Sequence, residues 1–379
     1  MDLKDIRKKI DGIDEQLLPL LKQRMELAAD VAEYKKANSI PVLNQAREDE
    51  ILERIGGKAG EYSDALKIIY ASMFDVSRAE QHRIMGAGKE LRSEVEGALN
   101  SKAERNDGAA IGCQGVTGAY SGIAAKKIFP NCKTRFYESF EEVFDAVENG
   151  ECRYGVIPIE NSSSGSVHEV YDLVLQHKFY IAEVVNLQIS HCLLAKKGAK
   201  KDELKTVCSK MQALEQCKRY IKDNKLNIKE EVNTAIASQK VSVSDDKTLC
   251  AIGSPLCAES YNLQIVEKDI QDSEKNSTRF IVISKYLEIV PDANKISFIF
   301  SIPHSAGSLY RILARFAMFG LNLTKIESRP IPEGNFEYYF YLDFSGNLEN
   351  EKTLDLMCAL SDELPYFSFL GNYRETDIN

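Results

Sequence analysis

The sequence lacks several signatures that mark large classes of protein. Its nine cysteines include no C-x-x-C pair and its five histidines no H-E-x-x-H, so neither common zinc motif is present. An odd number of scattered cysteines favours free thiols in a reducing cytoplasm over a disulfide framework. No apolar run is long enough to span a membrane, and we do not expect the charged segment MDLKDIRKKIDG to act as a signal peptide. We expect a cytoplasmic chain without a metal, a cofactor or a membrane partner.

Positive charge is also scarce. The chain has 48 lysines and arginines against 57 aspartates and glutamates, and its net charge of −9 disfavours nucleic acid as a partner. The negative net charge also repels small acidic substrates, so their binding depends on local basic pockets. With 379 residues, of which 44% are hydrophobic, the chain has the length for two or three globular domains, each with its own core.

The predicted secondary structure changes along the chain. The first 85 residues read as helices only, and a polar, partly helical connector follows. Short strands then alternate with helices as far as about residue 285, which indicates an α/β domain. The last part has the order βαββαβ, which is typical of an α+β, ferredoxin-like fold. We place the first domain, the connector and the two later domains at 1–88, 89–108, 109–286 and 294–374.

One stripe of the first helix combines apolar and cationic side chains. Its helical spacing continues through Arg24 and Lys35, which fall on the face expected to form the core. A lone cation on such a face is ordinarily solvated, but two unpaired cations are costly to bury, and an anionic ligand removes that cost. The third helix likewise places Ser77 and Gln81 on its inward face. The apolar part of the stripe consists of Ile6, Ile10, Ile13, Leu17 and Leu20.

These residues form part of a family resemblance. The segments IRKKIDGIDEQLLPLLKQRMELAADVAEYK, PVLNQAREDEILERI and SRAEQ, spread over residues 1–85, resemble the all-helical chorismate mutase. The resemblance implies a three-helix domain that forms an intertwined dimer, and a core as thin as three helices provide also favours a dimer. Its implied ligand is chorismate, a dianionic enol ether.

The same resemblance assigns roles to individual residues. Asn44 stands where several relatives carry Asp, so the local charge differs there. A Claisen rearrangement is unimolecular, and the site must hold the chair-like conformer and stabilise charge on the ether oxygen, which calls for fixed cations and donors. The implied ligands are Arg7, Arg24 and Arg47 for the carboxylates, Lys35 and Gln81 for the ether oxygen, and Glu48 for the ring hydroxyl, with Ser77 and Asn44 nearby.

The stretch YGVIPIENSSSGSV, residues 154–167, runs from an apolar strand through a small polar loop into the helical pattern HEVYDLVLQH. Its composition alone also fits a flexible linker. A strand, a loop of small residues and a helix N-terminus together make an anion site, because free N–H groups and the helix dipole point at the ligand. No Gly-Lys-Ser/Thr follows, so the loop is not a nucleotide P-loop. We expect a pocket for a small carboxylic acid.

The middle domain resembles prephenate dehydratase through GCQGVTGAYSGIAAKKIFP, the stretch just described, ISHCLLA and NSTRFIVIS. The resemblance implies two α/β lobes, like those of periplasmic binding proteins, with the substrate in the cleft between them. Thr278 corresponds to the essential hydroxyl, which we expect to donate to the departing ring hydroxyl. Glu160 is the nearest conventional acid, and we expect His191 to be structural. The implied substrate residues are Ser121, Glu160, Asn161, Ser162, Gly165, Arg279 and Phe280.

Two features of this domain depart from the family pattern. The loop GVTGAYS is closer to the form found in arogenate dehydratases, which leaves prephenate and arogenate both open as substrates. Lys210 and Met211 replace a His-Pro pair that is common in the family, and we expect this change to alter a loop and not the chemistry.

The last part resembles an ACT regulatory domain. The segments GSLYRIL, after a strand, and ESRP, at 327–330, correspond to the two motifs that bind phenylalanine. L-Phenylalanine is therefore the implied allosteric effector, while the alternative is a dimerisation module, and both functions can share one interface. The implied effector residues are Gly307, Ser308, Leu309, Glu327, Ser328 and Arg329.

Together the three resemblances predict a bifunctional enzyme of phenylalanine biosynthesis. It rearranges chorismate to prephenate, converts prephenate to phenylpyruvate, and works as a homodimer or tetramer under feedback inhibition by L-phenylalanine. Two alternatives remain open: arogenate dehydratase activity in the middle domain, and a non-catalytic amino-acid-binding regulator. The mutase residues and Thr278 disfavour the regulator.

Overall fold

The computed structural model describes residues 2–101, 108–273, 275–331 and 337–378. The chain forms two compact units. The first combines Met1–Gly97 with Phe298–Phe369, and the second combines Ala98–Ser297 with Leu370–Asn379. Among the described residues, no helix is both long enough and apolar enough to cross a membrane.

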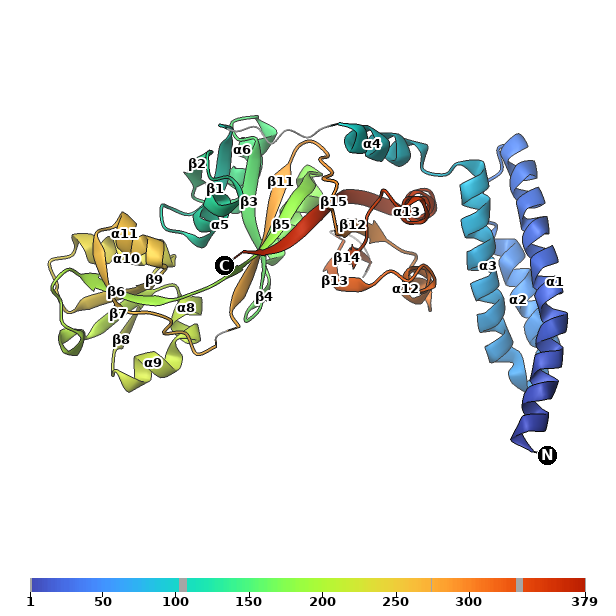
Figure 1. The fold of residues 1–379 in the computed structure, drawn as a ribbon, viewed down its shortest axis with the longest axis horizontal. Coiled ribbons are helices and arrows are strands. Elements are labelled where there is room, and N and C mark those ends of the chain that lie inside the picture. The colour runs from blue at the N-terminus through green and yellow to red at the C-terminus, as the bar shows by residue number, and fades with distance from the viewer. Residues whose placement is uncertain (1, 102–107, 274, 332–336, 379) are drawn as a thin grey trace. The chain divides into compact units, whose positions relative to one another are not determined.

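Helices form the N-terminal part of the first unit, as the sequence predicts (Figure 1). Asn44 begins the second helix, since its side chain accepts a hydrogen bond from the amide of Arg47. The third helix ends at Gly86, whose φ of +70° suits a left-handed C-cap. The expected connector begins with the helix α4, Lys89–Asn100, while residues 102–107 lie outside the described part of the chain. The first elements are α1 (Leu3–Ala37), α2 (Gln45–Ala59), a 3₁₀ turn (Gly60–Tyr62) and α3 (Ser63–Met85).

The apolar stripe of α1 is exposed in the single chain. Its residues range from 40% exposed at Ile6 to 61% exposed at Leu20. The buried residues of α1 are Ala28 and Ala32, and the helix packs mainly against α3. The expectation that the stripe lies in the core is therefore met only in part within one chain: Arg24 and Lys35 contact α3 and Ala28 is buried, whereas the apolar N-terminal part of the stripe is exposed.

The C-terminal part of the first unit has the expected order βαββαβ. Its sheet runs β13-β14-β12-β15, which is the ferredoxin-like arrangement, and the two helices α12 and α13 both contact α3. Its core contains the stacked rings of Phe298 and Phe316, which Phe344 contacts edge-on. Only the first residues of β15 belong to this unit. The elements are β12 (Lys295–Ser301), α12 (Ser308–Met318), β13 (Leu323–Pro330), β14 (Tyr338–Ser345), α13 (Glu351–Glu363) and β15 (Tyr366–Ile378).

The first lobe of the second unit is built on a mixed sheet ordered β5-β11-β3-β1-β2. The end of β15 adds to it by parallel pairing with β5, and β4 (Gly165–Ser166) pairs with β3. The strands are β1 (Ala110–Gln114), β2 (Lys133–Tyr137), β3 (Tyr154–Asn161), β5 (Tyr180–Gln188) and β11 (Ser277–Ser284), and the helices are α5 (Tyr120–Ile128), α6 (Phe140–Glu148) and α7 (His168–His177).

The second lobe has its own sheet, ordered β10-β6-β9-β7-β8. The chain enters this lobe after β5 and leaves it before β11, so two crossings join the lobes (Figure 1). This confirms the two-lobed α/β fold. The strands are β6 (Cys192–Lys196), β7 (Thr206–Ser209), β8 (Asn227–Glu230), β9 (Leu249–Gly253) and β10 (Leu263–Glu267), and the helices are a 3₁₀ turn (Lys201–Glu203), α8 (Met211–Gln216), α9 (Lys218–Asp223), α10 (Thr234–Val243) and α11 (Pro255–Ser260).

Candidate active and regulatory sites

Facing surfaces of α1 and α3 bring four of the predicted mutase residues together in two pairs. Arg24 Nη1 donates to Ser77 Oγ over 2.8 Å, and Lys35 Nζ donates to Gln81 Oε1 over 3.0 Å. The members of these pairs are 53 and 46 residues apart in the sequence. The pairing follows from helix periodicity, since residues four apart on α3 share one face.

The ammonium group of Lys35 is set up to donate to a ligand. It donates to Gln81 and, over 2.5 Å, to the carbonyl of Val42, and an ammonium has a third donor. Burial lowers the pKa of Lys35, while the charge of Glu48 opposes that change. A partly desolvated cation interacts more strongly with a developing negative charge than an exposed one does.

Glu48, on α2, accepts a hydrogen bond from the buried guanidinium of Arg78, which also pairs with Asp75. Arg78 was not predicted as a site residue, although it stands next to Ser77 in the motif SRAEQ. Because the carboxylate of Glu48 is fixed by a buried cation, it has a defined orientation beside the α1–α3 pairs.

Two further predicted residues do not join this group within one chain. Arg47 pairs with Glu50 at the surface, over 2.6 Å. Arg7 lies on the same continuous helix as Lys35 but 28 residues before it, which corresponds to roughly 42 Å along the axis. The two side chains of one α1 helix therefore cannot contact the same small ligand.

The second unit holds a cavity of about 380 Å³ between its lobes. Four predicted residues line it: Ser121, Asn161, Thr278 and Phe280. Glu160, Ser162, Gly165 and Arg279 are not among the lining residues. The lobes close around the site as expected, but four of the seven predicted substrate residues lie outside its wall.

Strand geometry explains this division. Side chains alternate along β11, so Thr278 and Phe280 share the cavity face and Arg279 points to the other face, where its Nε lies 3.0 Å from Glu375. On β3, a bulge leaves Ile159 unpaired between the partners of Arg279 and Phe280. The bulge lets Pro158 and Asn161, which are three residues apart, line the same cavity.

Asn161 organises the serine-rich loop. Its Oδ1 accepts hydrogen bonds from the amides of Ser163 and Ser164, over 3.0 and 3.1 Å. Backbone amides only donate, so the amide group of Asn161 must face Thr278 with its nitrogen, which donates to Thr278 Oγ1 over 2.9 Å. The loop is therefore ordered, unlike a flexible linker, and the proton of the Thr278 hydroxyl is left to donate elsewhere.

Ser162 has a different place from the one expected. Its hydroxyl donates to the carbonyl of Lys275 and accepts from the amide of Ser277. These bonds join the loop to the start of β11 and turn the Ser162 side chain away from the cavity.

Several polar residues of the cavity wall were not predicted as substrate residues. Glu169, in the first turn of α7, and Lys210, directly before α8, are its charged members. The expectation that Lys210 alters only a loop overlooked its position on the cavity wall. The signal for Glu169 was available, since the serine-rich loop leads directly into that turn.

His191 also lies in the cavity wall. It is buried, its Nδ1 lies 3.2 Å from the hydroxyl of Tyr120, and its Nε2 lies 2.9 Å from Oε1 of Gln216. Burial lowers the pKa of this imidazole, while the contact with Gln216 raises it. These contacts fit the structural role expected for His191 and join the two lobes, because Tyr120 belongs to the first and Gln216 to the second.

Another pocket, of about 420 Å³, lies in the first unit at the start of α12. Gly307, Ser308 and Leu309 line it, and Gly307 has a φ of +80°, in the left-handed region. The predicted residues of β13 do not line this pocket in a single chain. Glu327, Ser328 and Arg329 lie instead on β13, which pairs with β14 alone at the edge of its sheet.

Comparison with known proteins identifies two families in the chain. The prephenate dehydratase model matches residues 111–287 and the chorismate mutase type II model matches residues 6–82. The bifunctional chorismate mutase/prephenate dehydratase of Enterobacter agglomerans is 31% identical over 98% of this chain and 96% of its own length. Arogenate dehydratase/prephenate dehydratase 1 of Arabidopsis thaliana is 38% identical over 69% of this chain and 71% of its own length. The solved structure of prephenate dehydratase from Arthrobacter aurescens in complex with L-Phe is 26% identical, covers 70% of this chain and 89% of its own, and gives a TM-score of 0.64.

Proposed function

The chain belongs to the family of bifunctional chorismate mutase/prephenate dehydratases, and from this premise we propose how its residues perform and control the two reactions. The helical segment rearranges chorismate to prephenate. The second unit then converts prephenate to phenylpyruvate, so one polypeptide catalyses two consecutive steps of phenylalanine biosynthesis.

For the mutase step, the 3.0 Å pair of Lys35 and Gln81 supports the assignment. Both side chains direct donors at one point, where the ether oxygen of chorismate gains negative charge as its C–O bond breaks. Arg24 supplies a cation for a carboxylate, and Glu48 accepts from the ring hydroxyl. The protein forms no covalent bond in this reaction, so positioning and charge supply the whole effect.

The mutase site is completed by a second copy of the chain. Arg7 is too far from Lys35 along α1 to reach the same substrate, whereas an antiparallel second α1 places its Arg7 near that substrate. The exposed apolar stripe of α1 is the surface that such a partner covers. We take the homodimer as the smallest active form.

For the dehydratase step, the bond from Asn161 to Thr278 supports the assignment. The bond between the ring and its carboxylate breaks, its electron pair completes the aromatic ring, and the ring hydroxyl departs. Thr278, whose oxygen already accepts from Asn161, relays a proton to the departing oxygen, so that hydroxide leaves as water, and solvent returns a proton to Thr278. Carbon dioxide, water and phenylpyruvate are the products.

Arogenate is the second candidate substrate of the cleft. Glu169 in the cavity wall offers a carboxylate to the ammonium group that arogenate carries in place of the keto group of prephenate. Lys210 in the same wall favours the keto acid, since a cation repels an ammonium group. Bifunctional chorismate mutase/prephenate dehydratases match nearly the whole chain, which favours prephenate as the substrate.

L-Phenylalanine binds at the pocket formed by Gly307, Ser308 and Leu309 and lowers dehydratase activity. A turn followed by the N-terminus of α12 presents N–H groups to a carboxylate. The edge strand β13 of a second chain supplies Glu327, Ser328 and Arg329, which explains why a single chain does not bring the two motifs together.

The described cysteines are all free, which fits a reducing, cytoplasmic setting.

One assay tests the whole proposal. The purified protein receives chorismate, prephenate or arogenate separately, and the products are identified by mass. We expect prephenate and phenylpyruvate from chorismate, and phenylpyruvate from prephenate. Phenylalanine formed from arogenate at the higher rate would reassign the cleft, and the absence of any turnover would leave the amino-acid-binding regulator.

A further inference from the structure

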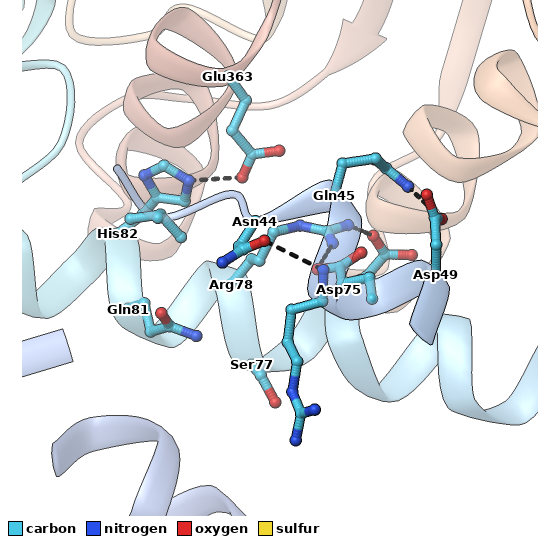
Figure 2. Close-up of polar contacts among 12 residues, drawn as sticks. Asn44, Gln45, Asp49, Asp75, Ser77, Arg78, Gln81, His82 and Glu363 are labelled. Carbon is cyan, nitrogen blue, oxygen red and sulfur yellow. Dashed lines mark hydrogen bonds and ion pairs between the residues drawn. The ribbon is translucent and has the colours of Figure 1, made fainter. Parts of the chain in front are cut away.

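Six charged or titratable side chains form a continuous buried row in the first unit, which we call the ionic chain. Its members, in order of contact, are Glu48, Arg78, Asp75, Arg315, Glu363 and His82. Three come from α3, one from α2, one from α12 and one from α13, so the row joins the helical segment to the C-terminal segment. Figure 2 shows its α3 members with Glu363.

The contacts within the ionic chain are close. Arg78 pairs with Glu48 through Nη1 and with Asp75 through Nη2. Arg315 pairs with Glu363 and lies 3.7 Å from Asp75 Oδ1. His82 Nε2 lies 2.6 Å from Glu363 Oε1.

Helix α3 presents two different faces, and the ionic chain lies on one of them. Ser77 and Gln81 point to the side that faces α1, whereas His82 points toward Glu363 (Figure 2). Arg78 and Asp75 follow the same helical spacing as His82. The two faces therefore separate the substrate-facing residues from the residues that contact α12 and α13.

Burial makes the members of the ionic chain depend on one another. Their side chains are between 5% and 20% exposed. A buried charge that loses its partner is strongly unfavourable, so each member holds its neighbours in place. Burial raises the pKa of Asp75, while the charges of Arg78 and Arg315 oppose that rise. Removal of Arg315 therefore also disfavours the charged form of the carboxyl group that orients Arg78.

A second cavity places the ionic chain beside the proposed effector pocket. A cavity of about 190 Å³ is lined by Glu48 and Arg78 on one side and by Arg315 and Ser308 on the other. It shares Ile302, Pro303 and Ser308 with the 420 Å³ pocket at the start of α12. The C-terminal segment therefore contributes directly to the surroundings of Glu48.

We propose that Arg315 is a positioning residue for the mutase reaction: through Asp75 and Arg78 it holds Glu48 in the orientation that binds the ring hydroxyl of chorismate. This inference rests on the proposed mutase function. Arg315 does not touch the substrate, and it belongs to the segment whose expected role is regulation alone. The mutase site of this chain is thus built in part by α12.

The test is a double-mutant cycle on chorismate turnover by the full-length chain. Arg315→Met is expected to lower kcat/KM for chorismate about tenfold, mainly through KM, and to leave prephenate turnover unchanged. In a Glu48→Gln background the same change is expected to have no further effect, because Glu48 is the group through which Arg315 acts. Arg315→Lys should restore part of the loss.

The control is Arg92→Met, which removes an ion pair between α4 and Asp355 of α13 that lies outside the ionic chain. It should leave the KM for chorismate unchanged. If Arg315→Met fails to fold by circular dichroism, Glu363→Gln is measured instead, since it releases Arg315 with little change in size and should raise KM in the same way. Effects of Arg315 and Glu48 that simply add, or an unchanged KM in an active protein, overturn the inference. A wild-type chain that fails to convert chorismate overturns the proposed function instead.

Discussion

Asn161 Nδ2 lies 2.9 Å from Thr278 Oγ1, although the two residues are 117 positions apart in the sequence. The loop amides that fix the other end of the Asn161 side chain leave it one orientation. The hydroxyl of Thr278 therefore accepts from Asn161, and its own proton is not used in that bond. The proposed role of Thr278 as a donor to the substrate rests on this proton.

Thr278→Val should stop dehydration and leave the mutase active, because valine keeps the shape of threonine but has no proton to donate. We expect the rate on supplied prephenate to fall about 100-fold or more. Prephenate should then accumulate from chorismate, as measured by chromatography. Thr324→Val, which changes an exposed strand threonine of the first unit, is the matched control and should leave the rate unchanged. Phenylpyruvate formed at the wild-type rate by Thr278→Val would refute the role of the hydroxyl.

Lys35→Ala should abolish chorismate rearrangement by removing the donor at the ether oxygen. A loss of about 3 kcal/mol of transition-state stabilisation, or roughly 100-fold in kcat/KM, is expected. Dehydratase activity on prephenate should survive, since it belongs to the other unit. The neighbouring Lys36 donates to the carbonyl of Ile84 at the surface, so Lys36→Ala should remain active. Equal rates for the two variants would contradict the assignment.

Mixing two inactive variants should restore mutase activity if a second chain supplies Arg7. Arg7→Ala and Arg24→Ala each disable every site of their own dimer. In a mixed dimer one of the two sites receives both native arginines, so random mixing should give about a quarter of the wild-type rate. Steady-state rates before and after subunit exchange measure this. Activity that stays at the level of the separate variants would place both arginines in the site of one chain.

The sequence was sufficient where local periodicity decides the outcome. Helical spacing placed Arg24 and Lys35 on the inward face of the first helix and Ser77 and Gln81 on that of the third, and the alternation of strands and helices indicated an α/β domain. The prediction did not distinguish Arg279, which points to the other face of β11, or Ser162, whose hydroxyl bonds to Lys275 and Ser277, from the residues of the cavity wall. The bulge at Ile159, which lets Asn161 line the same cavity as Pro158, arises from the pairing of two strands and cannot be recognised in the sequence of either one.

Contacts between segments that are distant in the sequence could not be predicted either. Nothing near Glu48 in the sequence indicates Arg78, and nothing near Asp75 indicates Arg315, 240 residues later. The apolar stripe of α1 stays a predicted packing face, because its residues are exposed in a single chain. The same holds for the two effector motifs, which a single chain leaves apart.

Acid should weaken the first unit through Glu363. Although burial raises the pKa of this carboxyl, the contact with His82 and the charge of Arg315 hold the pKa at about 2, below the ordinary 4.5. A lowered carboxyl pKa stabilises the fold above pH 4.5, and this contribution, about 3 kcal/mol, is lost as the pH falls toward 2. The free energy of unfolding of wild type should exceed that of Glu363→Gln by a margin that narrows over this range.

Urea unfolding followed by far-UV circular dichroism at a series of pH values measures this margin. Asp362→Asn is the control, since Asp362 is the exposed neighbour of Glu363 on α13 and lies outside the ionic chain. A margin that stays constant from neutral pH to pH 2 would show that Glu363 titrates alike in the folded and unfolded chain.

Gly307→Val should weaken L-phenylalanine binding and leave unregulated activity intact. A Cβ at Gly307 has open space, with its nearest neighbour at 3.7 Å, so the effect comes from the φ of +80° and not from crowding. Holding an L-residue in that region costs about 1–2 kcal/mol, which shifts the turn that presents its amides to the effector. Gly320→Val is the matched control: its φ is +67°, its Cβ also has open space, and it lies beyond the other end of α12, outside the pocket. Calorimetry and dehydratase rates against phenylalanine concentration should show a loss of inhibition in the first variant alone. Equal losses in both would attribute the effect to general strain in the unit, and a wild-type protein that ignores phenylalanine would leave the C-terminal segment as a dimerisation module.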